Sequence, residues 1–142
     1  MEFSMNKKKT IATVGVVLLL PLMADSARAA APSSPPIGKI CKATTSLIFG
    51  RSTQIMKLDA VENGIAYVHY FRPGDRSRWA IKCKLAGNRV LWASNNPDSI
   101  GRWRDDPADE TITYRIHGDA LDISEIYSDG SQERQSYSLS AL

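Results

Sequence analysis

Short runs of alternating apolar and polar residues, separated by turn residues, fill most of the chain beyond residue 39. A two-residue period is typical of strands with one buried and one solvated face, and no long 3.6-residue period predicts a helix. Asn63-Gly64, Gly87-Asn88, Gly118-Asp119 and Asp129-Gly130 lie between the runs and favour tight hairpin turns. We therefore predict eight antiparallel strands in up-and-down order: Ile40–Phe49, Gln54–Val61, Ile65–Arg72, Ser77–Ala86, Arg89–Ser94, Thr111–His117, Ala120–Tyr127 and Ser131–Leu139.

The hairpin around Gly118-Asp119 can be aligned residue by residue. If these two residues form the turn, Ile116 faces Leu121 on one side of the sheet and Arg115 faces Asp122 on the other. The apolar pattern, the turn residues and the opposite charges agree on this register.

The stretch RWAIKCKLAGNRVLWAS, residues 78–94, passes the same test. With Gly87-Asn88 as the turn, Leu85 faces Val90 and Cys83 faces Trp92. The cations of the first strand then point to the opposite, solvated face, as in any half-buried hairpin, and are available for binding. They are Arg78, Lys82 and Lys84.

A meander of eight strands must protect its first and last edges. Closure into a small barrel does this best, so the fold class we predict is all-β, a closed or strongly curled barrel with one disulfide. An open or split sheet with blunted edges is the alternative. A barrel of this size holds either a packed interior or one small ligand, and the pattern does not distinguish the two.

The first 29 residues have the three zones of a cleaved secretory signal peptide. Three lysines at 7–9 precede an apolar stretch from Thr10 to Ala24, and Ala27-Arg28-Ala29 has the small residues of a cleavage site. The apolar stretch is shorter than the ~20 residues of a membrane-spanning helix, so we expect no stable membrane insertion after cleavage. Translation starts at Met1 or Met5.

Residues 30–38 are rich in Pro, Ser and Ala and form a predicted tether, which leaves 39–142 as a single β domain. The domain contains both cysteines of the chain, Cys41 and Cys83. Because export places thiols in an oxidising compartment, the periplasm or the exterior, we predict that the two form a disulfide.

Charge is divided along the chain. Residues 39–104 contain twelve Lys/Arg and four Asp/Glu, a net charge of +8, whereas residues 105–142 contain two and nine, a net charge of −7. In a meander, strands that follow one another in the sequence are neighbours in the sheet. We therefore expect one side of the barrel to be cationic and the other anionic. Both could bind a partner, or the acidic last strand could pair with the basic first strand in a closed barrel.

Residues 95–110, NNPDSIGRWRDDPADE, are the longest predicted connection, and long loops on a rigid scaffold often contain binding residues. Trp103 lies between two arginines and precedes an acidic run. An exposed Trp of this kind is typical of protein interfaces and carbohydrate platforms, whereas a buried one would plug the end of a barrel. The binding residues we predict here are Arg102, Trp103, Arg104, Asp105 and Asp106.

Other functions have little support in the sequence. The paired carboxylates cluster in one loop, and neither His69 nor His117 lies in a nucleophile motif, so we expect no enzyme. The histidines also lack metal-ligand spacing, and we predict no metal and no cofactor. A nearly neutral, exported domain with an acidic block is a poor ligand for nucleic acid.

Tyr127-Ser128-Asp129-Gly130 resembles the Tyr-Ser-Asp-Gly motif of the membrane-bound type of bacterial lysozyme inhibitor. The resemblance covers four residues, and the aromatic and Lys-Gly pattern of that family does not follow Gly130. It implies an inhibitor-like binding role in which the acidic loop meets a basic enzyme.

The leading hypothesis is an exported, non-catalytic module that binds a protein or an anionic glycan of the bacterial cell envelope. It would use the 95–110 loop and the basic hairpin. A lipocalin-like carrier of a small apolar ligand is the alternative, and an enzyme of unrecognised type is the third. A large interior cavity would favour the carrier; a filled interior would favour the surface binder.

Overall fold

The computed structural model describes residues 14–16 and 33–142, of which Ser34–Leu142 form one compact unit. Apart from residues 14–16, the predicted signal peptide lies outside the described residues, as do residues 30–32 of the predicted tether; residues 33–36 are described as irregular chain, and 37–38 begin the first helix. Among the residues described, no helix is long and apolar enough to cross a membrane.

The first element of the unit is a helix, α1 (Ile37–Phe49), and the prediction of a strand over Ile40–Phe49 is wrong. Its buried side chains include Ile40, Cys41 and Thr44, and this spacing of three and four residues is the stripe of an amphipathic helix. Pro36 precedes the helix, and Gly50 ends it in the left-handed conformation with φ 61°. The prediction failed because the segment is rich in β-branched residues, which favour strands.

The rest of the unit is one antiparallel meander, as predicted, with a short 3-10 turn before it (Thr53–Ile55) and another after it (Leu139–Ala141). The sheet has the order β1-β2-β3-β4-β6-β7-β8, and β5 pairs with β4 beside it. The strands are β1 (Lys57–Glu62), β2 (Ile65–Phe71), β3 (Arg78–Ala86), β4 (Arg89–Asn96), β5 (Ser99–Ile100), β6 (Thr111–His117), β7 (Ala120–Ile126) and β8 (Gln132–Ser138).

The predicted all-β meander is confirmed, but the sheet is open: closure into a barrel is wrong, and the open sheet with blunted edges, which was the alternative, is what the structure has. The segment expected to pair with the last strand is instead α1, and β1 and β8 remain as edges. Irregular pairing in β1, between Leu58 and Ala60, and polar, mostly exposed side chains in β8 blunt these edges. The basic start and acidic end of the domain therefore do not pair as neighbouring strands.

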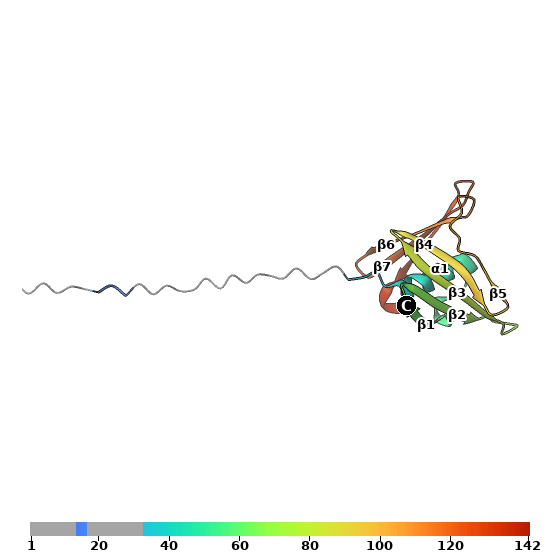
Figure 1. Cartoon of the computed structure of the whole chain (residues 1–142), viewed down its shortest axis with the longest axis horizontal. Coiled ribbons are helices and arrows are strands. Elements are labelled where there is room, and N and C mark those ends of the chain that lie inside the picture. The colour runs from blue at the N-terminus through green and yellow to red at the C-terminus, as the bar shows by residue number, and fades with distance from the viewer. Residues whose placement is uncertain (1–13, 17–32) are drawn as a thin grey trace, which may run out of the picture. The chain divides into compact units, whose positions relative to one another are not determined.

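Helix α1 covers one face of the sheet, here called the inner face (Figure 1). On that face it contacts strands toward both ends of the strand order, β1 to β3 and β7 to β8, and it supplies apolar side chains to the core. The largest fully buried side chains of that core come from the helix and from five of the strands: Ile40, Val68, Ile81, Val90, Ile112, Leu121 and Ile123. The interior is therefore filled by the helix and these side chains.

Both predicted hairpin registers are confirmed. Leu85 pairs with Val90 and Cys83 with Trp92 across β3 and β4. Across β6 and β7, Ile116 pairs with Leu121 and Arg115 with Asp122. The alternation of apolar and polar residues thus located the faces of these strands correctly.

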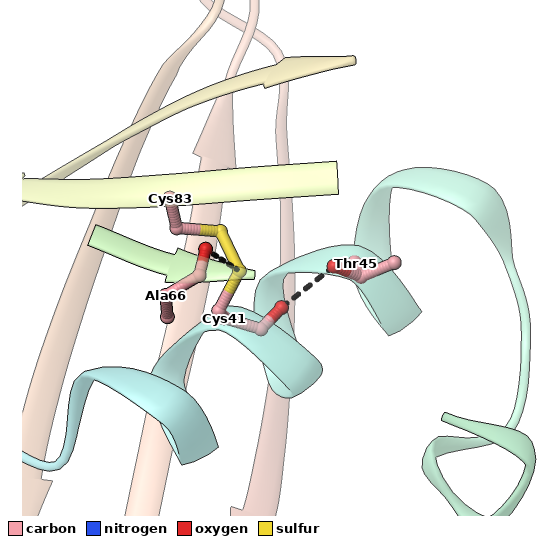
Figure 2. Close-up of a disulfide and its surroundings, with 4 residues drawn as sticks. All are labelled: Cys41, Thr45, Ala66 and Cys83. Atoms are coloured by element: carbon pink, nitrogen blue, oxygen red, sulfur yellow. Dashed lines mark hydrogen bonds between the residues drawn. A yellow bond between two sulfur atoms is a disulfide. The ribbon is translucent and has the colours of Figure 1, made fainter. Parts of the chain in front are cut away.

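The predicted disulfide is present and joins α1 to β3 (Figure 2). The Cα atoms of Cys41 and Cys83 lie 5.7 Å apart, and both residues are fully buried. Figure 2 also shows the carbonyl oxygen of Ala66, which lies 3.9 Å from Cys41 Sγ, and the hydroxyl of Thr45, which donates a 2.7 Å hydrogen bond to the Cys41 carbonyl. The bridge therefore ties the single α-helix of the described residues to the middle of the sheet.

Candidate functional site

The cations of the β3–β4 hairpin lie on the sheet face opposite α1, here called the outer face. Lys82 and Lys84 alternate with Ile81 and Cys83, which are buried against the core. Both lysines are half-buried. The predicted alternation of apolar and cationic side chains therefore holds for β3 from Ile81 to Leu85, whereas in β4 Val90 to Ala93 are all buried, and Leu91 and Ala93 lie on the same face as the lysines.

The long connection runs along the side of β4. Strand β4 pairs with β6 at one position only, Arg89 with Thr113, so most of its edge needs other partners. Strand β5 pairs with its end, and the backbone N–H groups of Gly101 and Arg104 each donate a 2.9 Å hydrogen bond, to the carbonyls of Ser94 and Trp92. The connection thereby occupies part of the edge of β4 that β6 leaves free.

Gly101 favours this close approach. A Cβ atom at this position would lie 3.1 Å from the backbone nitrogen of Ser94, closer than most side chains tolerate. The glycine therefore lets the backbone of the connection lie directly against β4.

Trp103 lies on the outer face and contacts the two lysines of the hairpin. Lys82 Nζ is 4.8 Å and Lys84 Nζ 4.2 Å from the centre of its ring, within the range of cation–π attraction. Trp103 is outside the hydrophobic core cluster, so it does not plug the interior as one interpretation of the sequence expected. These three predicted binding residues therefore form one group, here called the Lys–Trp cluster.

The two arginines that flank Trp103 are bound within the connection itself. Arg102 donates two hydrogen bonds of 2.7 Å to the carboxylate of Asp109, and Arg104 Nη1 lies 3.6 Å from the same group. The Arg104 guanidinium also lies 5.0 Å from the ring centre of Trp92. The hydrogen bonds from Arg102 hold the pKa of Asp109 down at about 2, so this carboxylate is ionised at neutral pH.

The remaining predicted residues lie apart from the Lys–Trp cluster or serve the backbone. Asp106 accepts a 2.9 Å hydrogen bond from the N–H of Ala108 and shapes the turn, and Asp105 is exposed. Arg78 lies 3.5 Å from Asp59, whose carboxylate also contacts His69 Nδ1 at 2.8 Å. Asp59, although predicted for no role, thus neutralises part of the outer face near β1.

The motif Tyr127 to Gly130 forms the turn between β7 and β8. The N–H of Gly130 donates a 2.9 Å hydrogen bond to the carbonyl of Tyr127, and Gly130 has a φ of 85° that favours glycine. Asp129 accepts hydrogen bonds from the backbone and hydroxyl of Ser131. Turn geometry therefore accounts for the Asp-Gly part of the motif and for its following serine.

Charge in the acidic half separates by face. Glu125 belongs to the inner face and is 5% exposed; burial raises its pKa, as do the charges of Glu110 and Glu133. The hydroxyl of Tyr127 donates a 3.1 Å hydrogen bond to Glu125, and burial with this carboxylate raises the pKa of Tyr127 to about 12. Acidic groups thus gather on the inner side of this half.

The outer face of the acidic half carries the cations Arg115 and Arg134 together with one carboxylate, Asp122. Sequence order did not predict this arrangement, because it assigns charge to whole strands. The alternation of residues within β6 to β8 could have indicated it.

Several polar hollows lie in the described unit. The largest, about 510 Å³, lies where the end of α1 and the residues after it meet β8, and polar groups such as Arg51, Glu133 and Gln135 line it. In the described part of the chain, no three metal-ligating side chains gather into a group that could hold an ion. No protein-family model, curated protein sequence or solved structure matches the chain.

Proposed function

We propose that this protein is an exported, non-catalytic binding module whose Lys–Trp cluster recognises an anionic glycan of the cell envelope. The observation that carries the proposal is that Lys82 and Lys84 share the ring of Trp103 on an open sheet face. Within residues 33–142, neither lysine forms an ion pair. An acidic ligand would supply the missing negative charge.

The chemistry of the cluster suits an acidic sugar. Ammonium groups attract carboxylates over several ångströms, and an aromatic ring beside them offers an apolar surface to the C–H groups of a pyranose. Tyr67 is the cross-strand neighbour of Lys82 and adds a second ring to the same row of the face. A row of rings and cations on the surface of a sheet suits an extended chain better than a buried small molecule.

The disulfide supports the exported part of the proposal, because such bonds persist mainly in oxidising compartments. The filled interior gives the carrier hypothesis less support, since a lipocalin-like protein needs room for its ligand inside the barrel. The surface binder is therefore the hypothesis that the geometry favours.

The test is binding of an oligogalacturonate, in which carboxylates are the only charges, by isothermal titration calorimetry. The double substitution Lys82→Gln/Lys84→Gln should weaken binding at least about tenfold, because it removes two charge-assisted contacts. Lys42→Gln/Lys57→Gln removes the same charge elsewhere and should leave binding within about twofold. An equal loss of affinity in both variants would mean that net charge alone attracts the ligand, and would reject the Lys–Trp cluster as a site.

A further inference from the structure

A second hollow, of about 220 Å³, lies on the outer face of the acidic half, away from the Lys–Trp cluster. Its walls come from β6, β7 and β8 and from the turn between β3 and β4. The polar residues that line it include Asn88, Thr113, Arg115, Asp122, Ser124 and Arg134. The hollow is therefore a small, polar concavity with two guanidinium groups in its wall.

These two arginines are the only cations of the sequence after residue 104, and the fold brings both to one hollow. Arg134 Nε donates a 3.1 Å hydrogen bond to the hydroxyl of Ser124, which fixes the guanidinium beside the hollow. Within residues 33–142, neither Arg115 nor Arg134 forms an ion pair. Their remaining N–H groups are thus free of carboxylate partners in that range.

A third arginine, Arg89, is a neighbour of residues that line the hollow but does not line it itself. Arg89 is the cross-strand partner of Thr113, and its Nε atom is buried without a hydrogen-bond partner among the described residues. A buried donor that lacks a partner is costly, and this one lies next to two residues that line the hollow, Asn88 and Thr113.

Asp122 is the one carboxylate in the wall, and other groups already hold it. His117 Nε2 lies 2.9 Å from Asp122 Oδ2, and the hydroxyl of Ser136 donates to Oδ1. Asp122 faces Arg115 across β6 and β7, yet the two form no ion pair. Two guanidinium groups against one carboxylate give the lining of the hollow a net positive charge.

We propose that this hollow binds a single tetrahedral oxyanion group, a phosphate or a sulfate. Guanidinium groups match the oxygens of such a group with paired N–H donors, and the hydroxyls of Thr113 and Ser124 add neutral donors. The volume suits one such group rather than a folded oligosaccharide. This site does not depend on the Lys–Trp cluster, which lies over β3 and β4.

The test is a titration of the uniformly ¹⁵N-labelled protein with sodium phosphate and, separately, sodium sulfate, at constant ionic strength set with sodium chloride. The amide signals of Thr113, Ser124 and Arg134 should shift and saturate. Arg115→Gln and Arg134→Gln should each raise the dissociation constant about tenfold, because each removes a charge-assisted contact. Lys57→Gln, which removes an exposed charge on β1 outside both proposed sites, should leave it unchanged.

Shifts that rise without saturation, or that persist equally in Arg134→Gln, would overturn the site. Both arginines are exposed, so the variants should fold, and matching amide spectra and melting temperatures would establish this. Phenyl phosphate and phenyl sulfate distinguish a site for the free ion from a site for a phosphate or sulfate group carried on a larger molecule. Tighter binding of the esters indicates a group carried on a larger molecule, whereas tighter binding of the inorganic ions indicates a site for the free ion.

Discussion

Glu125 is a carboxyl group in a site that disfavours its charge. It is 5% exposed, and burial and two neighbouring glutamates raise its pKa above the ordinary 4.5. The folded state therefore binds this proton more tightly than the unfolded chain does. The stability that results is fully present below pH 4.5 and is lost as the pH rises through the folded-state pKa.

Glu125→Gln should consequently raise the melting temperature at pH 7, where it removes a disfavoured charge, and change it little at pH 3. Thermal denaturation at the two pH values measures this. Glu62→Gln, at an exposed position on β1, is the control and should have no such pH-dependent effect. If Glu125→Gln instead lowered the melting temperature at pH 7, the folded protein would stabilise the ionised carboxylate of Glu125, which would contradict the prediction.

Asp109 is shifted in the opposite direction. Its pKa lies at about 2 because Arg102 donates hydrogen bonds to the ionised form. Its contribution to stability is therefore present above the ordinary pKa of 3.8 and is lost as the pH falls through about 2.

Asp109→Asn should loosen the connection between β5 and β6, because it breaks the paired hydrogen bonds from Arg102. Hydrogen exchange at the Arg104 amide, which donates to the Trp92 carbonyl, should accelerate roughly tenfold. Asp105→Asn is the control, because it changes an exposed carboxylate directly after Arg104. Equal exchange rates in both variants would show that the ion pair does not hold the connection.

At the scale of elements, Trp92 and Trp103 lie on opposite faces of β4 and should behave differently. Trp92 is 6% exposed, belongs to the core, and donates a hydrogen bond to Glu110. Trp92→Ala should cost about 3–5 kcal/mol, whereas Trp103→Ala, outside the core, should cost less than about 1.5 kcal/mol. Urea denaturation measures both, and equal costs would place Trp103 in the core after all.

The disulfide belongs to this scale as well, because it joins α1 to β3. It closes a loop of 42 residues, so replacing Cys41 and Cys83 by Ala should cost about 2–4 kcal/mol of the free energy of unfolding. Urea denaturation of the variant measures the loss. An unchanged midpoint would mean that packing alone holds the helix on the sheet.

The elements predicted best from the sequence are those with a strict period and a clear turn. Residues 78–94 and 111–126 gave the correct faces and registers because one slip would expose every buried side chain. Ile40–Phe49 was misassigned because its isoleucines and threonines favour strands, whereas its burial against the sheet follows a helical spacing. Local propensity could not reveal this tertiary contact.

The candidate site was predicted in part for a similar reason. The alternation in β3 indicated that Lys82 and Lys84 share a face, but nothing in the order of residues 95–110 indicated that Trp103 would lie over them. That placement depends on hydrogen bonds between the connection and β4. Likewise, the pairing of Arg102 with Asp109 is a property of how the loop closes.

At the scale of the whole molecule, the open sheet has an inner face that α1 covers and an outer face that carries both proposed binding sites. The inner face gathers the apolar core and the acidic group around Glu125. The outer face has the Lys–Trp cluster on the basic half and the arginine-lined hollow on the acidic half. Most of the core thus lies on the inner face, and both proposed binding sites lie on the outer face. Along the sequence, by contrast, charge separates into a basic first part and an acidic last part.

The most direct test of recognition by the Lys–Trp cluster is the salt dependence of oligogalacturonate binding. Calorimetry at roughly 50 mM and 300 mM NaCl compares conditions in which the Debye length falls by more than half. We predict that the affinity of the wild-type protein falls steeply over this range, and that Lys82→Gln/Lys84→Gln binds weakly at low salt with a much smaller further loss. An equal proportional loss in both proteins, or no binding by the wild type at low salt, would contradict the proposal.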